Sequence, residues 1–173
     1  MSGEIKLGRL GGLQLSTLPS AVISAIGLWT LLTMVAAGVI PLPMGAAILG
    51  CLIAAVLHYL SETLHQLGHA FAAKRAGYPM TGIRFWFLLS TSIYPPGEPS
   101  LPGRIHIQRA IGGPIVSVCA GLIAGVSAAM TTGLIGWIIA FVAFENLVVF
   151  GLGAFLPLGF TDGSTILTWW GKR

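Results

Sequence analysis

Charged residues and cysteines are scarce in this sequence of 173 residues. Lys, Arg, Asp and Glu make up only 8% of it, whereas hydrophobic residues make up 55%. A soluble domain averages about a quarter charged residues, so this chain has too few to cover a surface that faces water. Two cysteines are too few to staple a small secreted module, and both are expected to be small buried side chains inside helices. The composition therefore excludes an ordinary cytosolic protein and indicates one domain surrounded mostly by lipid.

Four long apolar segments predict four transmembrane helices. They are expected at 21–40, 44–76, 110–132 and 134–156. A helix of about 20 apolar residues crosses a hydrocarbon core of about 30 Å, and a helix satisfies its own backbone polar groups within lipid. We therefore expect an all-α polytopic membrane protein whose single domain covers residues 1–173.

The nine basic residues predict the orientation of these helices. They fall before the first helix, from the end of the second helix to the start of the third, and after the fourth, whereas the other two links carry none. Cytoplasmic loops are enriched in Lys and Arg, so both termini are expected in the cytoplasm of a multi-pass protein, in a prokaryotic plasma membrane. So few basic residues form no basic face, and no nucleic-acid partner is expected.

The long link between the second and third helices predicts a small β element. Residues 81–94 are rich in β-branched and aromatic side chains, 94–103 are rich in Pro and Gly, and 104–108 alternate between polar and apolar. This pattern is typical of a β-hairpin or sheet edge with a long loop, at or within the cytoplasmic interface. The first nineteen residues are compatible with a further short strand.

Ionisable side chains cluster in the second helix. At about 100° per residue, Glu62, His65, Gln66 and His69 share one stripe of its surface, with the two histidines one turn apart. Two imidazoles at this spacing can bind one zinc ion, which then needs a third ligand and an open position. Ionisable groups at membrane depth are costly and usually functional, so the stripe favours a metal site over two packing histidines.

Asp162 is the candidate third ligand. It follows the fourth helix in a segment, 156–163, that breaks the helix and returns to the face approached by His69. Asp162 could equally cap a short C-terminal helix starting near Gly163, and the two roles are compatible. Glu145 and Asn146 lie deeper in the fourth helix, where we expect a pairing with another helix or a contact to the metal ligands or substrate.

These residues resemble the site-2 protease family of intramembrane zinc metalloproteases. The sequence His65-Gln66-Leu67-Gly68-His69-Ala70 is similar to the family's helix motif His-Glu-x-Gly-His-Ala. Further similarities lie in Leu156-Pro157 with Asp162-Gly163, in Gly112-Gly113-Pro114 and in Leu7-Gly8-Arg9, which resemble its Asp-Gly signature, its Ala-Gly-Pro motif and its N-terminal strand. The resemblance covers nearly the whole chain. It implies that His65, His69 and Asp162 bind Zn²⁺ and that the activity is hydrolysis of peptide bonds in transmembrane substrates.

The sequence departs from the family's motifs at several positions. Gln66 stands where the family has its catalytic Glu. Ser117 and Ala154 stand where it usually has Asn, and Gly159 and Phe160 replace its proline pair. The missing Glu would take a proton from water and later give it to the leaving amine. A carboxamide accepts no proton at neutral pH, and loss of a general base costs about 10²- to 10⁴-fold in rate.

Three explanations of Gln66 are open at this stage. In the first, Glu62 replaces it as the base from one turn earlier on the same stripe, although Glu62 could instead hydrogen-bond to His65 or to a neighbouring helix. In the second, the chain is a natural pseudoprotease that binds or regulates membrane partners without cleaving them. In the third, Gln66 was introduced to trap an inactive enzyme, which the altered Asn and Pro positions disfavour.

The expected partners are the lipid bilayer and a transmembrane protein segment, as substrate or as ligand. Such a segment would unwind and add as a strand to the edge formed within residues 78–108, which satisfies its backbone and exposes the bond. A small transporter is disfavoured, because four helices without an evident repeat offer little for alternating access.

Overall fold

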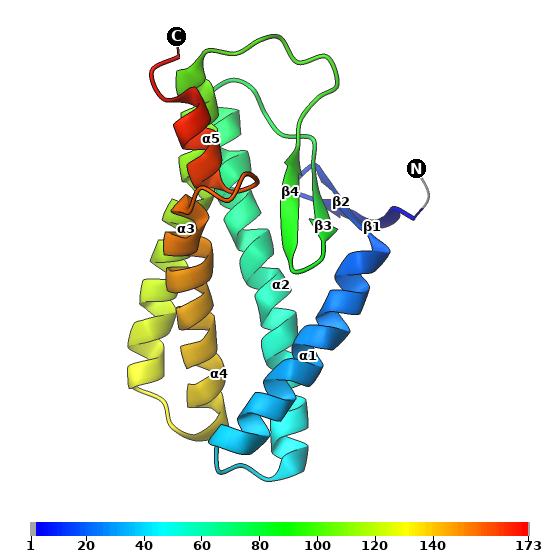
Figure 1. Cartoon of the computed structure of the whole chain (residues 1–173), viewed down its shortest axis with the longest axis vertical. Helices are drawn as coiled ribbons and strands as arrows, with labels where there is room; N and C mark the ends of the chain where they lie inside the picture. Colours follow the sequence, from blue (N-terminus) through cyan, green and yellow to red (C-terminus); the bar gives the residue numbers. More distant parts are fainter. Residues whose placement is uncertain (1–2, 173) are drawn as a thin grey trace.

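The computed structural model describes residues 3–172 and consists of a helix bundle with a small sheet beside one half of it (Figure 1). Within the described chain, four helical segments are long and apolar enough to cross a membrane. They are α1 (Pro19–Val39), α2 (Met44–Arg75), α3 (Gly103–Ala129) and a fourth that begins with α4 (Gly133–Phe144) and ends at Phe155. These segments confirm the prediction of an all-α membrane protein with four candidate spans and a small β element.

The two short links of the bundle lie at the same end. Figure 1 shows the link between α1 and α2 beside the link between α3 and α4, whereas the C-terminus lies at the opposite end. The sheet and the short helix α5 (Asp162–Trp169) lie in the half of the molecule away from these links (Figure 1). An even number of spans gives this arrangement, and which end faces the cytoplasm stays a prediction.

The fourth span is not the single helix expected from the sequence. After α4 the chain continues as a π-helix, η1 (Glu145–Leu152), and a 3₁₀ turn, η2 (Gly153–Phe155). The wider turns of a π-helix let the adjacent residues Glu145 and Asn146 both point inward, where they are 5% and 1% exposed. Both bond to α2, Glu145 through His58 and Asn146 through Ser61, so the expected pairing with another helix is present.

The sheet has four strands in the order β1-β2-β3-β4. The N-terminal residues form a hairpin, β1 (Ile5–Leu10) and β2 (Leu13–Thr17), where the sequence suggested one further strand. The link between α2 and α3 forms the second hairpin, β3 (Gly82–Trp86) and β4 (Leu89–Ile93), and β2 pairs with β3 in parallel. A core of Leu13, Ile83 and Phe85 from the sheet and Ala73 from α2 holds the two layers together.

The strand expected at residues 104–108 is absent, because α3 begins at Gly103. Pro102 occupies the position before the first turn, where its fixed φ suits a helix start and its missing N–H is no loss. The apolar residues of this stretch alternate, as in a strand. The same stretch also fits a helix, because Ile105 and the following Arg109 are one helical turn apart and both are buried. Alternation over five residues did not distinguish a strand from an amphipathic helical turn.

Cys119 is exposed on α3, contrary to the expected burial.

Helices α2 and α3 cross at two glycines. A Cβ added to Gly68 would overlap the carbonyl oxygen of Gly112, and a Cβ added to Gly112 would overlap the carbonyl oxygen of Gly68. Only glycine at both positions lets the two backbones come this close, a means of helix association common in membranes. The crossing therefore fixes the distance between the two helices one residue away from His69.

We expect Gly112→Ala to destabilise the protein, because the added methyl group must push α2 and α3 apart. Overpacking of this kind costs about 1–3 kcal/mol, and a lower melting temperature of the purified protein in detergent would report it. Gly125→Ala is the matched control on α3, since a Cβ at Gly125 would lie 4.0 Å from Ala143, an ordinary contact. Equal melting temperatures for the two variants would contradict the tight crossing.

Candidate metal centre

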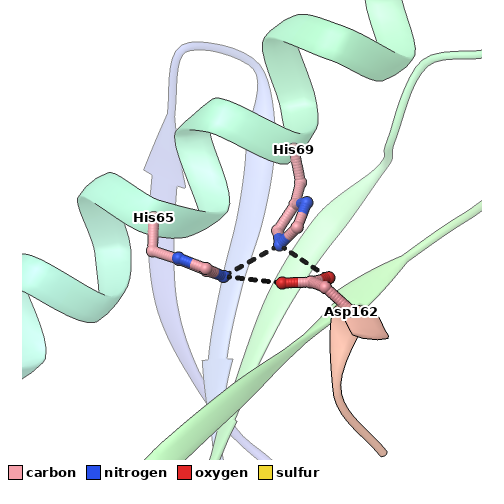
Figure 2. A group of neighbouring side chains, drawn as sticks. All are labelled: His65, His69 and Asp162. Atoms are coloured by element: carbon pink, nitrogen blue, oxygen red, sulfur yellow. Dashed lines mark hydrogen bonds and ion pairs between the residues drawn. The ribbon is translucent and has the colours of Figure 1, made fainter. Parts of the chain in front are cut away.

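Two histidines from α2 and one aspartate from α5 converge on one point (Figure 2). The Nε2 atoms of His65 and His69 lie 2.9 Å apart. Asp162 places Oδ2 3.3 Å from His65 Nε2 and Oδ1 3.4 Å from His69 Nε2. The structure thus brings together all three residues that the sequence named as metal ligands, although Asp162 is the first residue of α5 rather than its cap.

The other nitrogen of each imidazole is held by α3. His69 Nδ1 lies 2.8 Å from the carbonyl oxygen of Arg109, and because a carbonyl only accepts, Nδ1 carries the proton and Nε2 presents a lone pair. His65 Nδ1 lies 2.9 Å from Ser117 Oγ. Such bonds to the outer nitrogen orient metal-binding histidines in general. Ser117, which stands where the resembled family usually has Asn, therefore contacts a candidate ligand directly.

Glycines make room for the three side chains. Gly113 of α3 lies against both imidazoles, and a Cβ there would overlap the Nε2 atom of His69. Gly163 packs against the carbonyl oxygen of Phe155, so that only glycine can follow Asp162 at the start of α5. The Gly112-Gly113 and Asp162-Gly163 pairs seen in the sequence are thus explained by close contacts on the two sides of the triad.

The donor set suits a divalent zinc ion. Tetrahedral ligands at the usual zinc distances lie about 3.3 Å from one another, close to the two separations that Asp162 makes. A carboxylate facing nitrogen lone pairs is also repulsive unless a cation or a proton lies among them.

The triad lies between two cavities. One is a cleft of about 840 Å³ that the hairpin β3–β4 and residues 148–162 enclose above α2, with Trp86, Val148, Phe150 and Phe160 among its apolar lining residues. The other is a vestibule of about 360 Å³ with polar residues such as Glu98, His106 and Thr165 in its wall. His69, Gln66 and Asp162 line both. A polypeptide and water could therefore reach the triad from different sides.

Gln66 and Glu62 are both bonded to the strand β4. Glu62 Oε1 accepts from the backbone N–H of Ser90 at 2.7 Å and from its hydroxyl at 2.6 Å. Gln66 Oε1 accepts from the Ser92 hydroxyl at 2.7 Å, and Gln66 Nε2 donates to the Ser90 carbonyl at 3.3 Å. From the sequence we considered His65 or a neighbouring helix as the hydrogen-bond partner of Glu62, whereas the observed partner is the strand β4. Glu62 nevertheless lines the same cleft as the triad.

Sequence reasoning missed His58. Its ring lies one turn before Glu62 on the stripe of α2, which was the available signal, and it is 4% exposed. Nδ1 lies 2.6 Å from Glu145 Oε1, and Nε2 donates to the Leu88 carbonyl at 2.7 Å. His58 therefore joins α2, η1 and the hairpin that together form the cleft.

Arg109 is a second buried residue that the sequence did not single out. Its guanidinium donates to Glu98 and to the Tyr78 carbonyl, and its Cζ lies 4.0 Å from the centre of the Tyr94 ring. Hydrogen bonds from Arg109 lower the pKa of Glu98. These contacts hold the loop after β4 against one end of α3. At that same end, the Arg109 carbonyl fixes the ring of His69.

Comparison with known proteins identifies the architecture. No family model and no curated protein matches the sequence. Among solved structures, the site-2 protease from Methanocaldococcus jannaschii is similar over 95% of this chain and 69% of its own, with a TM-score of 0.58 and 18% sequence identity. The fold is similar to that of this protease. At this identity the likeness concerns the fold alone, and it agrees with the architecture that the motif resemblance implied.

We expect Ser117→Ala to weaken zinc binding by about 10- to 100-fold, the usual cost of removing a partner that orients a histidine ligand. Competition with a chromogenic chelator measures this affinity. Ser127→Ala is the control on the same helix, because the Ser127 hydroxyl donates to the carbonyl of Ile123 within α3 and to no other described residue. A Ser117→Ala protein that binds zinc like the control would show that Ser117 does not support the centre.

Proposed function

We propose that this chain is a zinc-dependent intramembrane peptidase of the site-2 protease type. The observation that carries the proposal is the convergence of His65, His69 and Asp162 on one point in the wall of an apolar cleft, within a site-2 protease fold. His65, His69 and Asp162 would hold the ion, and Ser117 and Arg109 would orient the two imidazoles. When bound, zinc would polarise the scissile carbonyl and acidify water.

Glu62 is the proposed general base. It is the carboxylate that shares the cleft with the triad from the same stripe of α2, one turn before Gln66. One of its oxygens is bonded to Ser90, and the other has no hydrogen bond among the described residues. Glu62 would take a proton from water and pass it to the leaving amine. Gln66 has no proton-accepting group and would take no part in this transfer.

The proposed substrate is an apolar segment of a membrane protein in extended form. The cleft is lined by the apolar side chains of the hairpin and of η1, so it suits such a segment, while the vestibule would supply water from the side of Arg109 and Glu98. The chain would lie in a prokaryotic plasma membrane with both termini in the cytoplasm, the face to which its basic residues point.

A second candidate is a pseudoprotease that binds membrane segments without cleaving them. One observation favours it specifically: Gln66 and Glu62, which line the cleft beside the triad, are both hydrogen-bonded to β4. Retained metal binding without hydrolysis would then make it a membrane protein that binds or regulates its partners.

We expect the purified protein to bind zinc, and we expect His65→Ala and Asp162→Ala to lose it, since each removes one of three ligands. Elemental analysis of protein in detergent gives the zinc content. Glu4→Gln changes an exposed carboxylate just before β1 that pairs with Arg84, and this variant is the control that should retain zinc. Wild-type protein without zinc after exposure to it would overturn the metal assignment.

We expect wild-type protein to cleave a model transmembrane substrate and Glu62→Gln to lose about 10²- to 10⁴-fold in rate, the usual cost of losing a general base. Reconstitution of enzyme and substrate in the same vesicles, followed by gel analysis of the fragments, measures this. Full activity of Glu62→Gln would show that Glu62 is not the base. Cleavage by Gln66→Glu but not by wild type would establish the pseudoprotease instead.

A further inference from the structure

The strand β4 lies at the end of the sheet, so within residues 3–172 one of its two edges has no partner strand. In an antiparallel pair, successive residues direct their backbone polar groups to opposite sides. The Ile93 carbonyl accepts from Thr81, next to β3, so Ser90 and Ser92 must point their backbone groups away from β3. An edge of this kind is a template for pairing with another chain, and within a membrane its polar groups need partners.

Side chains of α2 bond in regular order to this edge and to the turn just before it. His58 donates to the Leu88 carbonyl, Glu62 accepts from the Ser90 N–H, and Gln66 donates to the Ser90 carbonyl. The three residues are spaced by one helical turn, and their backbone targets run in chain order from Leu88, in the turn just before β4, to the N–H and carbonyl of Ser90 within it. Donor, acceptor and donor alternate as they would on a neighbouring strand.

We propose that side chains of α2 take the place of a neighbouring strand at the free edge of β4 and so prevent another segment from pairing there. In this proposal, Gln66 controls the release of the edge. The set of side chains His58, Glu62 and Gln66, here called the clasp, occupies the positions that the backbone of an extended polypeptide would take. In the proposed function, on which this step rests, a substrate segment pairs with β4 only after the clasp has released it.

The residue types of the clasp match its partners. Position 62 receives two donors, the N–H and the hydroxyl of Ser90, and a carboxylate only accepts. Position 66 faces one acceptor, the Ser90 carbonyl, and one donor, the Ser92 hydroxyl. A carboxamide meets both, whereas a glutamate would place a carboxylate oxygen against the Ser90 carbonyl. The chain thus contains a structural reason for Gln66 that is independent of catalysis.

Burial strengthens the clasp. Its three side chains are between 3% and 5% exposed, so little water competes for their hydrogen bonds. His58 is itself fixed from behind by Glu145 on η1, at 2.6 Å, so that the hairpin and η1, which enclose the cleft, are tied to the same helix. Release of β4 would therefore widen the cleft on the side of the hairpin.

Amide hydrogen exchange of residues 88–93 tests the clasp in the full chain in detergent micelles, after removal of metal by a chelator. We expect Gln66→Glu to accelerate this exchange about 2- to 10-fold, the factor that corresponds to one lost hydrogen bond. Ser92→Ala, a milder variant that removes only the hydroxyl bonded to Gln66, should act in the same direction. Thr91→Val, which removes a hydroxyl that makes no hydrogen bond among the described residues, is the control on the same strand and should leave the exchange unchanged.

Unchanged exchange in Gln66→Glu and Ser92→Ala would overturn the proposal. Acceleration by Thr91→Val as large as that by Ser92→Ala would also overturn it, because the effect would then come from any change in β4. If Gln66→Glu does not fold, Ser92→Ala against Thr91→Val decides the question alone. Neither zinc nor a substrate takes part in the measurement, so failure of the peptidase proposal would leave this result interpretable.

Discussion

The close crossing of α2 and α3 at Gly68 and Gly112 is the constraint on which the centre depends. It brings the backbone of α3 so near to α2 that the Arg109 carbonyl and the Ser117 hydroxyl reach the outer nitrogens of His69 and His65. With those nitrogens held, the inner ones have a single direction left, toward Asp162. A membrane gives no hydrophobic drive for two helices to associate, so small residues and polar bonds must do this instead.

The need to satisfy polar groups within a membrane explains how the sheet is bonded to α2. A short hairpin beside membrane-spanning helices cannot leave the outer edge of β4 without partners, and α2 provides them from side chains rather than from backbone. Polar residues on α2 therefore serve two purposes that the sequence does not separate. His65 and His69 face the centre, whereas His58, Glu62 and Gln66 face the strand.

Much of the fold and part of the site could be predicted from the sequence, because the deciding features were local. The four spans follow from length and hydropathy, and the pair His65 and His69 from its spacing on one helix. The pairing of His58 with Glu145 could not be predicted, because the two residues are 87 positions apart in the sequence. Glu145 also lies on a π-helix, and no local sequence pattern indicates where a π-helix occurs. The start of α3 was missed because five alternating residues fit a strand and a helical turn equally.

The π-helix η1 limits where residues can be inserted into or deleted from the chain. It contains Asn146, which is bonded to Ser61 of α2, and it precedes Asp162, the third member of the triad, in the chain. Loss of one residue from a helix rotates the part of the helix that follows by about 100° about its axis, so a deletion within η1 would displace the segment that leads to Asp162. The links at 40–43 and 130–132 lie at the far end of the bundle, where added length disturbs nothing near the triad (Figure 1). Variation in length should therefore accumulate in those links, and the stretch between α4 and α5 should keep a constant number of residues.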